Sequence, residues 1–389
     1  FFGYVVVQRT GSILRHVTLH GLCLLFSGGA EHEVAQATVS RCPGTGVQVL
    51  AADRTQVTGL DVHDNSGHGI LVESSNDVVV RGCEVYYNGG CGIAVTGGWR
   101  HRLEANLVGV RHSSGATGLP NKQCGIRVHG ARNMTVGGSQ PEDGNVISGN
   151  NFHTYDVGFW VTGTTTGTFQ NNVLGLDPSG TQLVLPRQFT NADFKSGQWV
   201  IRDCAFAGSQ HDNLYINSAD SLIADCTFGT NRAGTQALDD YSSSHIFSLN
   251  PDGVVAVRGC VFAGTPRARA MYARTNDRFE ENFVGTDRSG QLRLGIRYGV
   301  WAEDRNVLIE RNVFRYVSFY VIDLGPDVTG SARFLNNTVL DTEHIMSAGS
   351  SKSPSLLSVD PDAGVVHGVL TAPDHLYLPG DNGLCKQTK

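Results

Sequence analysis

The chain has 389 residues, 17% of them charged, and a formal net charge of −6 at pH 7. This mildly acidic balance gives no reason to expect a nucleic acid or an anionic membrane surface as a partner. No apolar run is long enough to cross a bilayer, so membrane insertion is not expected. The 48 glycines suit a chain with many turns.

The chain opens on an apolar, strand-like segment, Phe1-Phe-Gly-Tyr-Val-Val-Val7. No signal peptide is visible, so the sequence is expected to be processed or to belong to a longer protein. No amphipathic helix precedes the first repeat to cover its apolar end. We therefore expect this end to stack on a preceding domain or on a neighbouring copy.

One short pattern then recurs down the chain, each time with Leu, Cys or Asn at its first position. The shortest intervals between occurrences are 22 and 23 residues, and longer intervals fit the same unit with an inserted loop. A repeat this short is one turn of a stacked structure rather than a domain. The first positions are Leu60, Cys83, Asn106, Asn145, Asn172, Cys204, Cys226, Cys260, Asn282, Asn312 and Asn337.

Each repeat contains three short runs in which apolar residues alternate with polar ones, separated by Gly, Asn and Asp. One repeat reads Val78–Val80, Glu84–Tyr86 and Gly92–Val95. Helical periodicity is nearly absent. Because strands of successive turns pair about 4.8 Å apart, the pattern predicts an all-β solenoid. We expect a right-handed parallel β-helix with about 13 coils of three short strands.

The recurring first position is expected at a corner between two strands, where equivalent side chains lie above one another. Stacked Asn amides hydrogen-bond to each other and to turn backbone. A Cys fills the same slot as a small group that is easily buried. The eleven positions are therefore interpreted as a structural ladder, with its four cysteines as buried thiols.

The repeats resemble the right-handed parallel β-helix repeat family, within the superfamily that includes pectate lyases and polygalacturonases. Three phrases are similar to a version common in secreted and cell-surface proteins: Asn145-Val-Ile-Ser-Gly-Asn150, Asn172-Val-Leu-Gly-Leu-Asp-Pro-Ser-Gly-Thr181 and Asn282-Phe-Val-Gly-Thr-Asp-Arg-Ser-Gly290. The resemblance covers about residues 10–350. It implies an extracellular or cell-surface location, but no particular function, because this scaffold serves enzymes, adhesins and inert fibres alike.

The unbroken repeat predicts a single β-helix domain over residues 1–346. Residues 347–389 break the pattern with segments such as Ser350-Ser-Lys-Ser-Pro354. They are expected to form an irregular tail, which acts as a cap or as a linker to a further domain.

The chain has nine cysteines, an odd number, so not all can pair within it. Cys91 and Cys124 both precede Gly-Ile and are expected one above the other on adjacent turns, where a disulfide is allowed but not required. Cys42 follows a different register, beside a column formed by Asn65 and Asn88. No Cys-x-x-Cys motif occurs, so no metal site is predicted.

Two sequons, which begin at Asn133 and Asn336, are candidate glycosylation sites in a secreted protein. Asn336 precedes the inward-facing Asn337, so strand alternation directs its side chain outward.

Two clusters offer the residue types that enzymes of the superfamily use, and the second consists of His211, Asp212 and Asn213 with Asp220, Asp225, Asp239 and Asp240. His63, Asp64 and His68 lie in one turn, and Gly67-His68-Gly69 resembles a short motif of polygalacturonases. That family also needs an Asp pair shortly before this motif and an Arg-x-Lys after it. Here the only Asp pair, Asp239-Asp240, comes about 170 residues later, and no Arg-x-Lys occurs. No catalytic site is therefore predicted, and these five residues are weak candidates.

Three functions stay open. The leading hypothesis is a non-catalytic extracellular structural module of a cell-surface or filament assembly, whose partners are copies or domains stacked end to end. The second is a polysaccharide lyase or glycoside hydrolase with an unrecognised groove site, and calcium is the one cofactor considered. The third is a carbohydrate-binding or adhesive module with glycan partners, which a continuous exposed aromatic stripe would favour. The rings considered are Tyr86, Tyr87, Trp99, Phe159, Trp160, Trp199, Tyr215, Tyr272, Tyr298 and Trp301.

Overall fold

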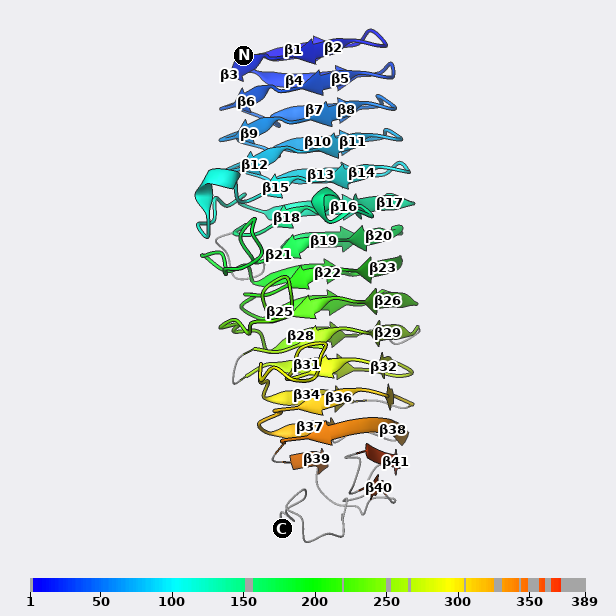
Figure 1. The fold of residues 1–389 in the computed structure, drawn as a ribbon. Coiled ribbons are helices and arrows are strands. Elements are labelled where there is room, and N and C mark those ends of the chain that lie inside the picture. The colour runs from blue at the N-terminus through cyan, green and yellow to red at the C-terminus, as the bar shows by residue number, and fades with distance from the viewer. Residues whose placement is uncertain are drawn as a thin grey trace. The chain divides into compact units, whose positions relative to one another are not determined.

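The computed structural model describes residues 3–150, 157–218, 220–249, 253–264, 267–303, 306–324, 331–342, 344–348, 357–360 and 365–371. The chain divides into two compact units, residues 1–209 and residues 210–389. Within each unit, short parallel strands from successive coils lie side by side (Figure 1). The expectation of one domain over residues 1–346 stays a prediction.

In the first unit, each coil gives one strand to each of three parallel series. The first series is β1 (Tyr4–Val7), β4 (Cys23–Ser27), β7 (Val47–Leu50), β10 (Ile70–Glu73), β13 (Ile93–Thr96), β16 (Cys124–His129), β19 (Val157–Thr162) and β22 (Thr190–Phe194). The second is β2 (Ile13–Arg15), β5 (Glu33–Ala35), β8 (Gln56–Thr58), β11 (Val79–Arg81), β14 (Arg102–Glu104), β17 (Met134–Gly137), β20 (Thr166–Gln170) and β23 (Gln198–Arg202). The third is β3 (Thr18–His20), β6 (Thr38–Ser40), β9 (Asp61–His63), β12 (Glu84–Tyr86), β15 (Leu107–Val108), β18 (Val146–Ile147), β21 (Val173–Leu174) and β24 (Ala205–Phe206). Two short 3₁₀ turns, η1 (His112–Ser114) and η2 (Pro141–Asp143), lie in inserted loops.

The second unit repeats this plan. Its first series is β25 (Asp212–Ile216), β28 (Ser244–Ser248), β31 (Arg269–Ala273), β34 (Tyr298–Ala302), β37 (Tyr320–Leu324) and β39 (His344–Ala348). The second is β26 (Ser221–Ala224), β29 (Val255–Arg258), β32 (Arg278–Glu280) and β35 (Leu308–Glu310), and the third is β27 (Thr227–Phe228), β30 (Val261–Phe262), β33 (Phe283–Val284) and β36 (Val313–Arg315). The long strand β38 (Ser331–Leu340) pairs with both β35 and β36. The predicted all-β, right-handed parallel β-helix is confirmed.

Part of the segment expected to be irregular forms strands. β41 (Val365–Thr371) pairs antiparallel with β38, and β40 (Leu357–Asp360) pairs antiparallel with β41. An antiparallel strand laid on the last long strand satisfies backbone groups that a further coil would otherwise pair. The remainder of residues 349–389, with Cys385, lies outside the described residues.

Alternating side chains fill the interior of each unit. In the first unit, Ile70, Ile93, Ile126 and Phe159 occupy register-equivalent positions of neighbouring strands and are fully buried. In the second unit, the rings of Phe228, Phe262, Phe279, Phe314 and Phe334 form a buried column, with successive centroids 4.9–6.3 Å apart. The interior is therefore built from rows of like side chains, one from each coil.

A single residue in the left-handed region turns the chain at most ladder corners. Ala105, Glu281 and Asn336, each one position before a ladder residue, have φ of 53°, 56° and 53°. This conformation is unfavourable for residues other than glycine and asparagine. The stacked corner persists because the hydrogen bonds of the next residue offset that cost.

The Asn ladder predicted from the repeat is confirmed. The side-chain nitrogen of Asn106 donates to Asn145 Oδ1 at 2.9 Å, and that of Asn145 donates to Asn172 Oδ1 at 2.9 Å. In the second unit, the side chain of Asn282 donates to Asn312 Oδ1 at 3.1 Å, and that of Asn312 donates to Asn337 Oδ1 at 2.9 Å. Cys83, Cys204, Cys226 and Cys260 are buried cysteines outside the disulfides in the same corner, and Leu60 begins the row.

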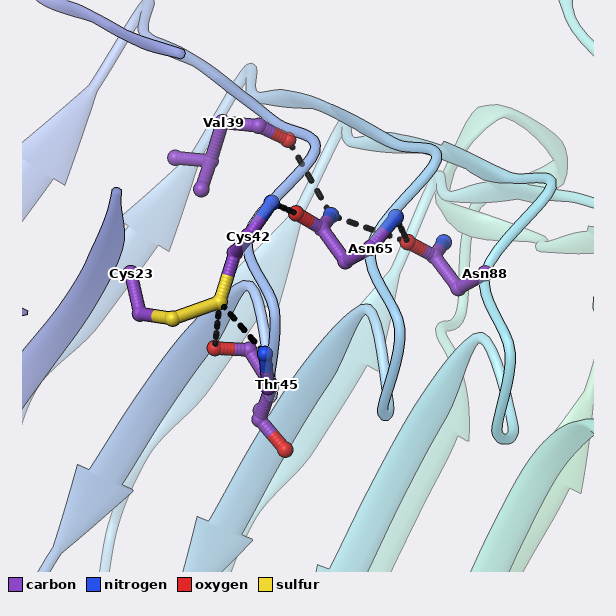
Figure 2. The surroundings of a disulfide bond; sticks show 7 residues. Cys23, Val39, Cys42, Thr45, Asn65 and Asn88 are labelled. Atoms are coloured by element: carbon purple, nitrogen blue, oxygen red, sulfur yellow. Dashed lines mark hydrogen bonds between the residues drawn. A yellow bond between two sulfur atoms is a disulfide. The ribbon is translucent and has the colours of Figure 1, made fainter. Parts of the chain in front are cut away.

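A second polar column runs through the first unit. Figure 2 shows its beginning, where the Cys42 backbone N–H donates to Asn65 Oδ1 and the Asn65 amide donates to Asn88 Oδ1, both at 2.9 Å. The column continues through Asn121 and Asn150, with the corresponding bonds at 2.9 and 2.8 Å. The sequence indicated only Cys42, Asn65 and Asn88, because inserted loops lengthen the later intervals to 33 and 29 residues.

Two disulfides lie in the first unit. Cys91 and Cys124 are joined, as their expected stacking allowed, with Cα atoms 4.4 Å apart. Cys23 and Cys42 form a second bridge that the sequence did not suggest, with Cα atoms 5.1 Å apart (Figure 2). Cys42 thus ends the second polar column with a covalent link to β4.

Three inserted loops share one construction. Asp177 Oδ1 accepts the backbone N–H groups of the residues four and five positions on, both at 2.9 Å. Asn231 and Asp287 accept the equivalent pairs in their own loops. Burial alone would raise the pKa of Asp287, but hydrogen bonds from Leu292, Ser289 and Gln291 lower it overall. These carboxylates and amides organise turns, as such residues commonly do.

We expect Asn282→Leu to lower the free energy of unfolding by about 1–3 kcal/mol. The substitution removes the acceptor of the Cys260 N–H and the donor to the Val257 carbonyl, and both groups are buried. Urea denaturation followed by circular dichroism measures the change. Asn217→Leu, at an exposed position of the same unit, is the control. An unchanged midpoint for Asn282→Leu would show that the ladder does not stabilise the fold.

We expect the four ladder thiols to resist alkylation in the native protein. Burial raises the pKa of Cys83 to about 12 and also raises that of Cys260, and the thiolate is the reactive form. Iodoacetamide labelling followed by peptide mass spectrometry should find them unmodified until denaturant is added. Cys23, Cys42, Cys91 and Cys124 should remain disulfide-linked in both conditions. Native labelling of Cys83 or Cys260 would contradict this assignment.

Candidate functional site

The outer face of β16, β19 and β22 carries an unusual row of side chains in the first unit. Arg127, Trp160 and Asp193 occupy equivalent positions of these strands, because Arg127 pairs with Trp160 and Trp160 with Asp193 in the parallel register. Their neighbours on either side, such as Ile126 and Val128, point into the core. Alternation therefore directs all three side chains away from the core, about 4.8 Å apart from strand to strand.

Each of these three side chains has a buried polar atom without a hydrogen-bond partner among the described residues. The atoms are Arg127 Nε, Trp160 Nε1 and Asp193 Oδ1. Two are donors and one is an acceptor. Buried polar groups are nearly always paired, so unpaired ones call for a functional or solvent explanation. Three such atoms on adjacent strands form one polar cluster rather than a single packing defect.

Asp193 has the most unusual environment of the row. It is 7% exposed, and burial raises its pKa to about 6, partly opposed by Lys195. The Lys195 Nζ lies 3.5 Å from Asp193 Oδ2 and 5.6 Å from the centroid of the Trp160 ring. The ammonium therefore bridges the carboxylate and the indole. A carboxyl group with a raised pKa beside cationic and aromatic groups is typical of functional sites.

The structure brings one of the weak catalytic candidates toward this row. His68 Nδ1 accepts the Cys91 backbone N–H at 3.0 Å. Burial lowers the pKa of His68, and the positive charge of Arg127 lowers it further. His68 is thus held as a neutral imidazole at neutral pH, in electrostatic contact with the site.

The other weak candidates are placed elsewhere. His63 hydrogen-bonds to Asp64 at 2.7 Å and stacks on Tyr86, with ring centroids 5.1 Å apart. Asp240 is fully buried and accepts from the Asn213 amide at 2.7 Å. Asp239 lines an open hollow of about 380 Å³ between two inserted loops of the second unit. Asp240 is therefore part of the polar interior. Asp239 faces the hollow instead, so the two carboxylates do not form one site.

An aromatic column lies on the first series of the second unit. Tyr215, Phe247, Tyr272 and Trp301 occupy equivalent positions, and all are partly exposed. Successive rings are nearly parallel, with centroids 5.6, 4.5 and 6.0 Å apart. Rings at these separations lie face against face with an offset. The ring faces therefore contact one another within the column, and mainly the ring edges point outward.

The remaining rings considered from the sequence differ in their positions. Phe159 and Trp199 are buried in the core, whereas Trp99 is half exposed on a turn. The sequence did not suggest Phe247. Its signal was the pattern Ser-His-Ile-Phe-Ser, which aligns with Asp-Asn-Leu-Tyr-Ile one coil earlier.

Both sequon asparagines, Asn133 and Asn336, lie exposed at corners of the coil. Their glycosylation stays a prediction. Among the described residues, no cluster of three or more His, Cys, Asp or Glu side chains could hold a metal ion. No described helix is long and apolar enough to span a membrane.

The chain is a right-handed parallel β-helix protein, as the strand series show. A family model described as a right-handed beta helix region matches residues 5–140, which confirms the resemblance seen in the repeats. No curated protein matches the chain.

Several solved structures share the fold at low similarity. The tailspike protein gp49 of Pseudomonas phage LKA1 is 12% identical over 90% of this chain and 63% of its own, with a TM-score of 0.42. ORF18 of Geobacillus virus E2 is 9% identical over 82% of this chain and 54% of its own, with a TM-score of 0.40. The A-module of the Azotobacter vinelandii mannuronan C-5 epimerase AlgE6 is 11% identical, covers 90% and 86%, and has a TM-score of 0.32. The matched region of this chain thus covers less than two thirds of the length of each of the two viral proteins. Similarities this weak carry no functional argument.

We expect Asp193→Asn to change how stability depends on pH. The folded-state pKa of Asp193 is about 6, above its ordinary value of 3.8, so the folded protein disfavours the charged form. The wild-type free energy of unfolding should therefore fall between about pH 4 and pH 6 relative to the variant, by about 3 kcal/mol in total. Thermal melts across this range measure the difference. Asp64→Asn, at an exposed corner, is the control, and parallel wild-type and Asp193→Asn profiles would contradict the assignment.

Proposed function

We propose that this protein is a non-catalytic, extracellular carbohydrate-binding module that binds a glycan on the outer face of β16, β19 and β22. The observation that carries the proposal is the row of three buried, unpaired polar atoms on Arg127, Trp160 and Asp193. An unpaired buried polar group costs about 1–3 kcal/mol. A ligand that displaces the atoms covering this row and supplies the missing partners removes that cost.

Adjacent hydroxyl groups on a sugar ring fit the row. A hydroxyl both donates and accepts, so one can accept from the Trp160 N–H and another can donate to Asp193 Oδ1. A ring oxygen or hydroxyl can accept from Arg127 Nε. The indole also offers apolar surface to the C–H groups of the sugar, the usual combination in small-molecule sites. Ordered water is the competing occupant of such a surface.

Two disulfides support an extracellular location. Cys23–Cys42 and Cys91–Cys124 link residues within one unit, and structural disulfides persist mainly in oxidising compartments. The exposed sequons at Asn133 and Asn336 are consistent with the same location.

Binding is favoured over catalysis because the row supplies one carboxylate. Glycoside hydrolysis uses two, at separations matched to the mechanism. The row contains Asp193 alone, and its other members are a guanidinium and an indole. End-to-end assembly and, as the alternative, hydrolase or lyase activity remain hypotheses from the sequence.

Glycan-array screening followed by isothermal titration calorimetry tests the proposal. With the best-bound neutral oligosaccharide of the array, Trp160→Phe keeps the ring but removes the N–H donor. We expect it to weaken binding by about fivefold to tenfold, the value of one hydrogen bond. Trp99→Phe, at a half-exposed position of the same unit, should leave the affinity unchanged.

Asp193 gives the test a pH signature. Ionised Asp193 accepts a charge-assisted hydrogen bond from a hydroxyl, so the affinity should rise between pH 5 and pH 7, through the pKa of about 6. In Asp193→Asn this rise should vanish. Absence of any bound glycan, or equal affinities for wild type and Trp160→Phe, would overturn the proposal.

A further inference from the structure

Two inserted loops of the second unit enclose the open hollow of about 380 Å³ that Asp239 lines. One loop, residues 229–243, joins β27 to β28, and the other, residues 285–297, joins β33 to β34. The coil between them connects β30 to β31 through residues 263–268 only. Figure 1 shows β28, β31 and β34 in consecutive coils. The hollow therefore lies where a coil with a short connection separates two coils with long ones.

Backbone hydrogen bonds hold both loops against the coil. In the first loop, the Leu238 N–H donates to the Gly229 carbonyl at 2.9 Å. In the second, the Leu294 N–H donates to the Gly285 carbonyl at 3.1 Å. Each bond closes its loop onto the residue that follows a strand of the third series. The walls of the hollow are therefore formed before any ligand arrives, as is usual for small-molecule sites.

The two loops differ in the charges that they bring to the hollow. Ala237 and Arg293 occupy equivalent positions, each in an antiparallel bridge with the threonine at the start of its loop. Two positions further on, Asp239 in the first loop is equivalent to Gly295 in the second. The lining thus receives a carboxylate from one loop and a guanidinium from the other. Both charged residues are exposed, so a molecule from solvent can reach them.

An aromatic ring, rather than an acidic residue, holds the Arg293 side chain. Its guanidinium carbon lies 5.4 Å from the centroid of the Tyr316 ring. Arg315 lies over the same ring at 4.9 Å, but its charge is already paired with Asp341 at 2.7 Å. Arg293 pairs with no carboxylate in the described part of the chain. The ring orients this guanidinium, and its fork of donors is suited to a carboxylate ligand.

The rest of the lining is mainly apolar. Leu238, Leu294 and Ile296 contribute aliphatic side chains, and Ser318 contributes a hydroxyl. Small-molecule sites of about 300–1,000 Å³ commonly combine apolar walls with a few polar groups that fix the orientation of the ligand. Because the hollow offers one charge of each sign, a zwitterion with apolar substituents matches it better than an ion of one sign.

The spacing of the loops sets the length of that zwitterion. The loops are two coils apart, which is about 10 Å at the ordinary strand spacing. An extended peptide advances about 3.3–3.6 Å per residue, so two or three residues span most of this distance. A free amino acid carries its ammonium and its carboxylate on one carbon atom and is too short to contact both walls.

We propose that this hollow binds short peptides of about two or three residues with apolar side chains. The peptide carboxylate accepts hydrogen bonds from Arg293, the peptide ammonium donates to Asp239, and the side chains lie against Leu238, Leu294 and Ile296. A carboxylate accepts several hydrogen bonds, so Asp239 receives the ammonium in addition to its contacts within the chain. This site does not depend on the glycan binding proposed for the first unit.

Isothermal titration calorimetry with dileucine and trileucine tests the ligand class. Wild type should bind one molecule of the better ligand per chain, and added salt should weaken binding because the contacts are ionic. The C-terminal amide and the N-acetyl derivative of that peptide each lack one charge. Each derivative should therefore bind about fivefold more weakly than the free peptide, the upper value of an exposed ion pair.

Two variants assign each peptide charge to its partner. In Arg293→Gln, the free acid and the amide should bind equally, whereas the N-acetyl peptide should still bind more weakly. In Asp239→Asn, the N-acetyl and free peptides should bind equally, and the preference for the free acid should remain. Arg278→Gln, which changes an exposed arginine of the same unit, should keep both preferences. Because all three positions are exposed, the melting temperatures should stay near that of wild type.

Three results would overturn the proposal. The first is failure of wild type to bind either peptide. The second is an Arg293→Gln variant that still prefers the free acid to the amide. The third is a wild-type affinity that N-acetylation leaves unchanged, because any small anion would then account for the binding.

Discussion

Every coil of this protein depends on the next one for its hydrogen bonds. A strand of three to five residues has almost no stability alone, and the amides at its corners are fully buried. Asn145 shows how complete the dependence is. Its side-chain oxygen accepts from the backbone and the side chain of Asn106, and its nitrogen donates to the Leu103 carbonyl and to Asn172. All four hydrogen-bonding capacities of one amide are used, and each joins one coil to another.

Because corner residues make the hydrogen bonds between coils, the outward positions of the strands are not needed for them. Inward residues must fill the core, and corner residues must complete the ladders. An outward residue on a strand is not required for either, so the fold constrains its identity least. Arg127, Trp160 and Asp193 occupy three such positions in succession. Outward positions of the first strand series in the second unit hold stacked rings at Tyr215, Phe247 and Tyr272. The regular coil therefore fixes the distance between outward side chains on neighbouring strands. The identity of those side chains determines the chemistry of the surface.

The sequence predicted the features that repeat and missed those that the loops displace. The Asn ladder could be found because the same short pattern follows each member, although the intervals range from 22 to 39 residues. The second column was visible only at Cys42, Asn65 and Asn88, because insertions shift its later members. The Cys23–Cys42 bridge was not expected, since Cys23 lies in a strand of its own and its partner was assigned to a polar column.

The row of Arg127, Trp160 and Asp193 escaped prediction for a different reason. Arg127, Trp160 and Asp193 are 33 residues apart in both steps, and the segments Gly-Ile-Arg-Val, Gly-Phe-Trp-Val and Asn-Ala-Asp-Phe align once that interval is used. Aligning these three segments would have shown that the three side chains are adjacent. It would not have shown that the three polar atoms lack partners, because that depends on how loops and neighbouring side chains exclude water from each atom.

The energetic character of the row explains why it points to a ligand rather than to stability. A pKa of about 6 for Asp193 means that its ionised form is less favourable in the folded protein than in the unfolded chain, and each unpaired donor adds a further cost. A coil selected for stability alone would place paired polar residues at these outward positions. Sites that depart from local rules in this way are typically functional, with the cost offset by the rest of the fold. The stacked coils, whose corner amides are fully hydrogen-bonded, provide that offset, so the fold tolerates a polar surface that only a ligand or water completes.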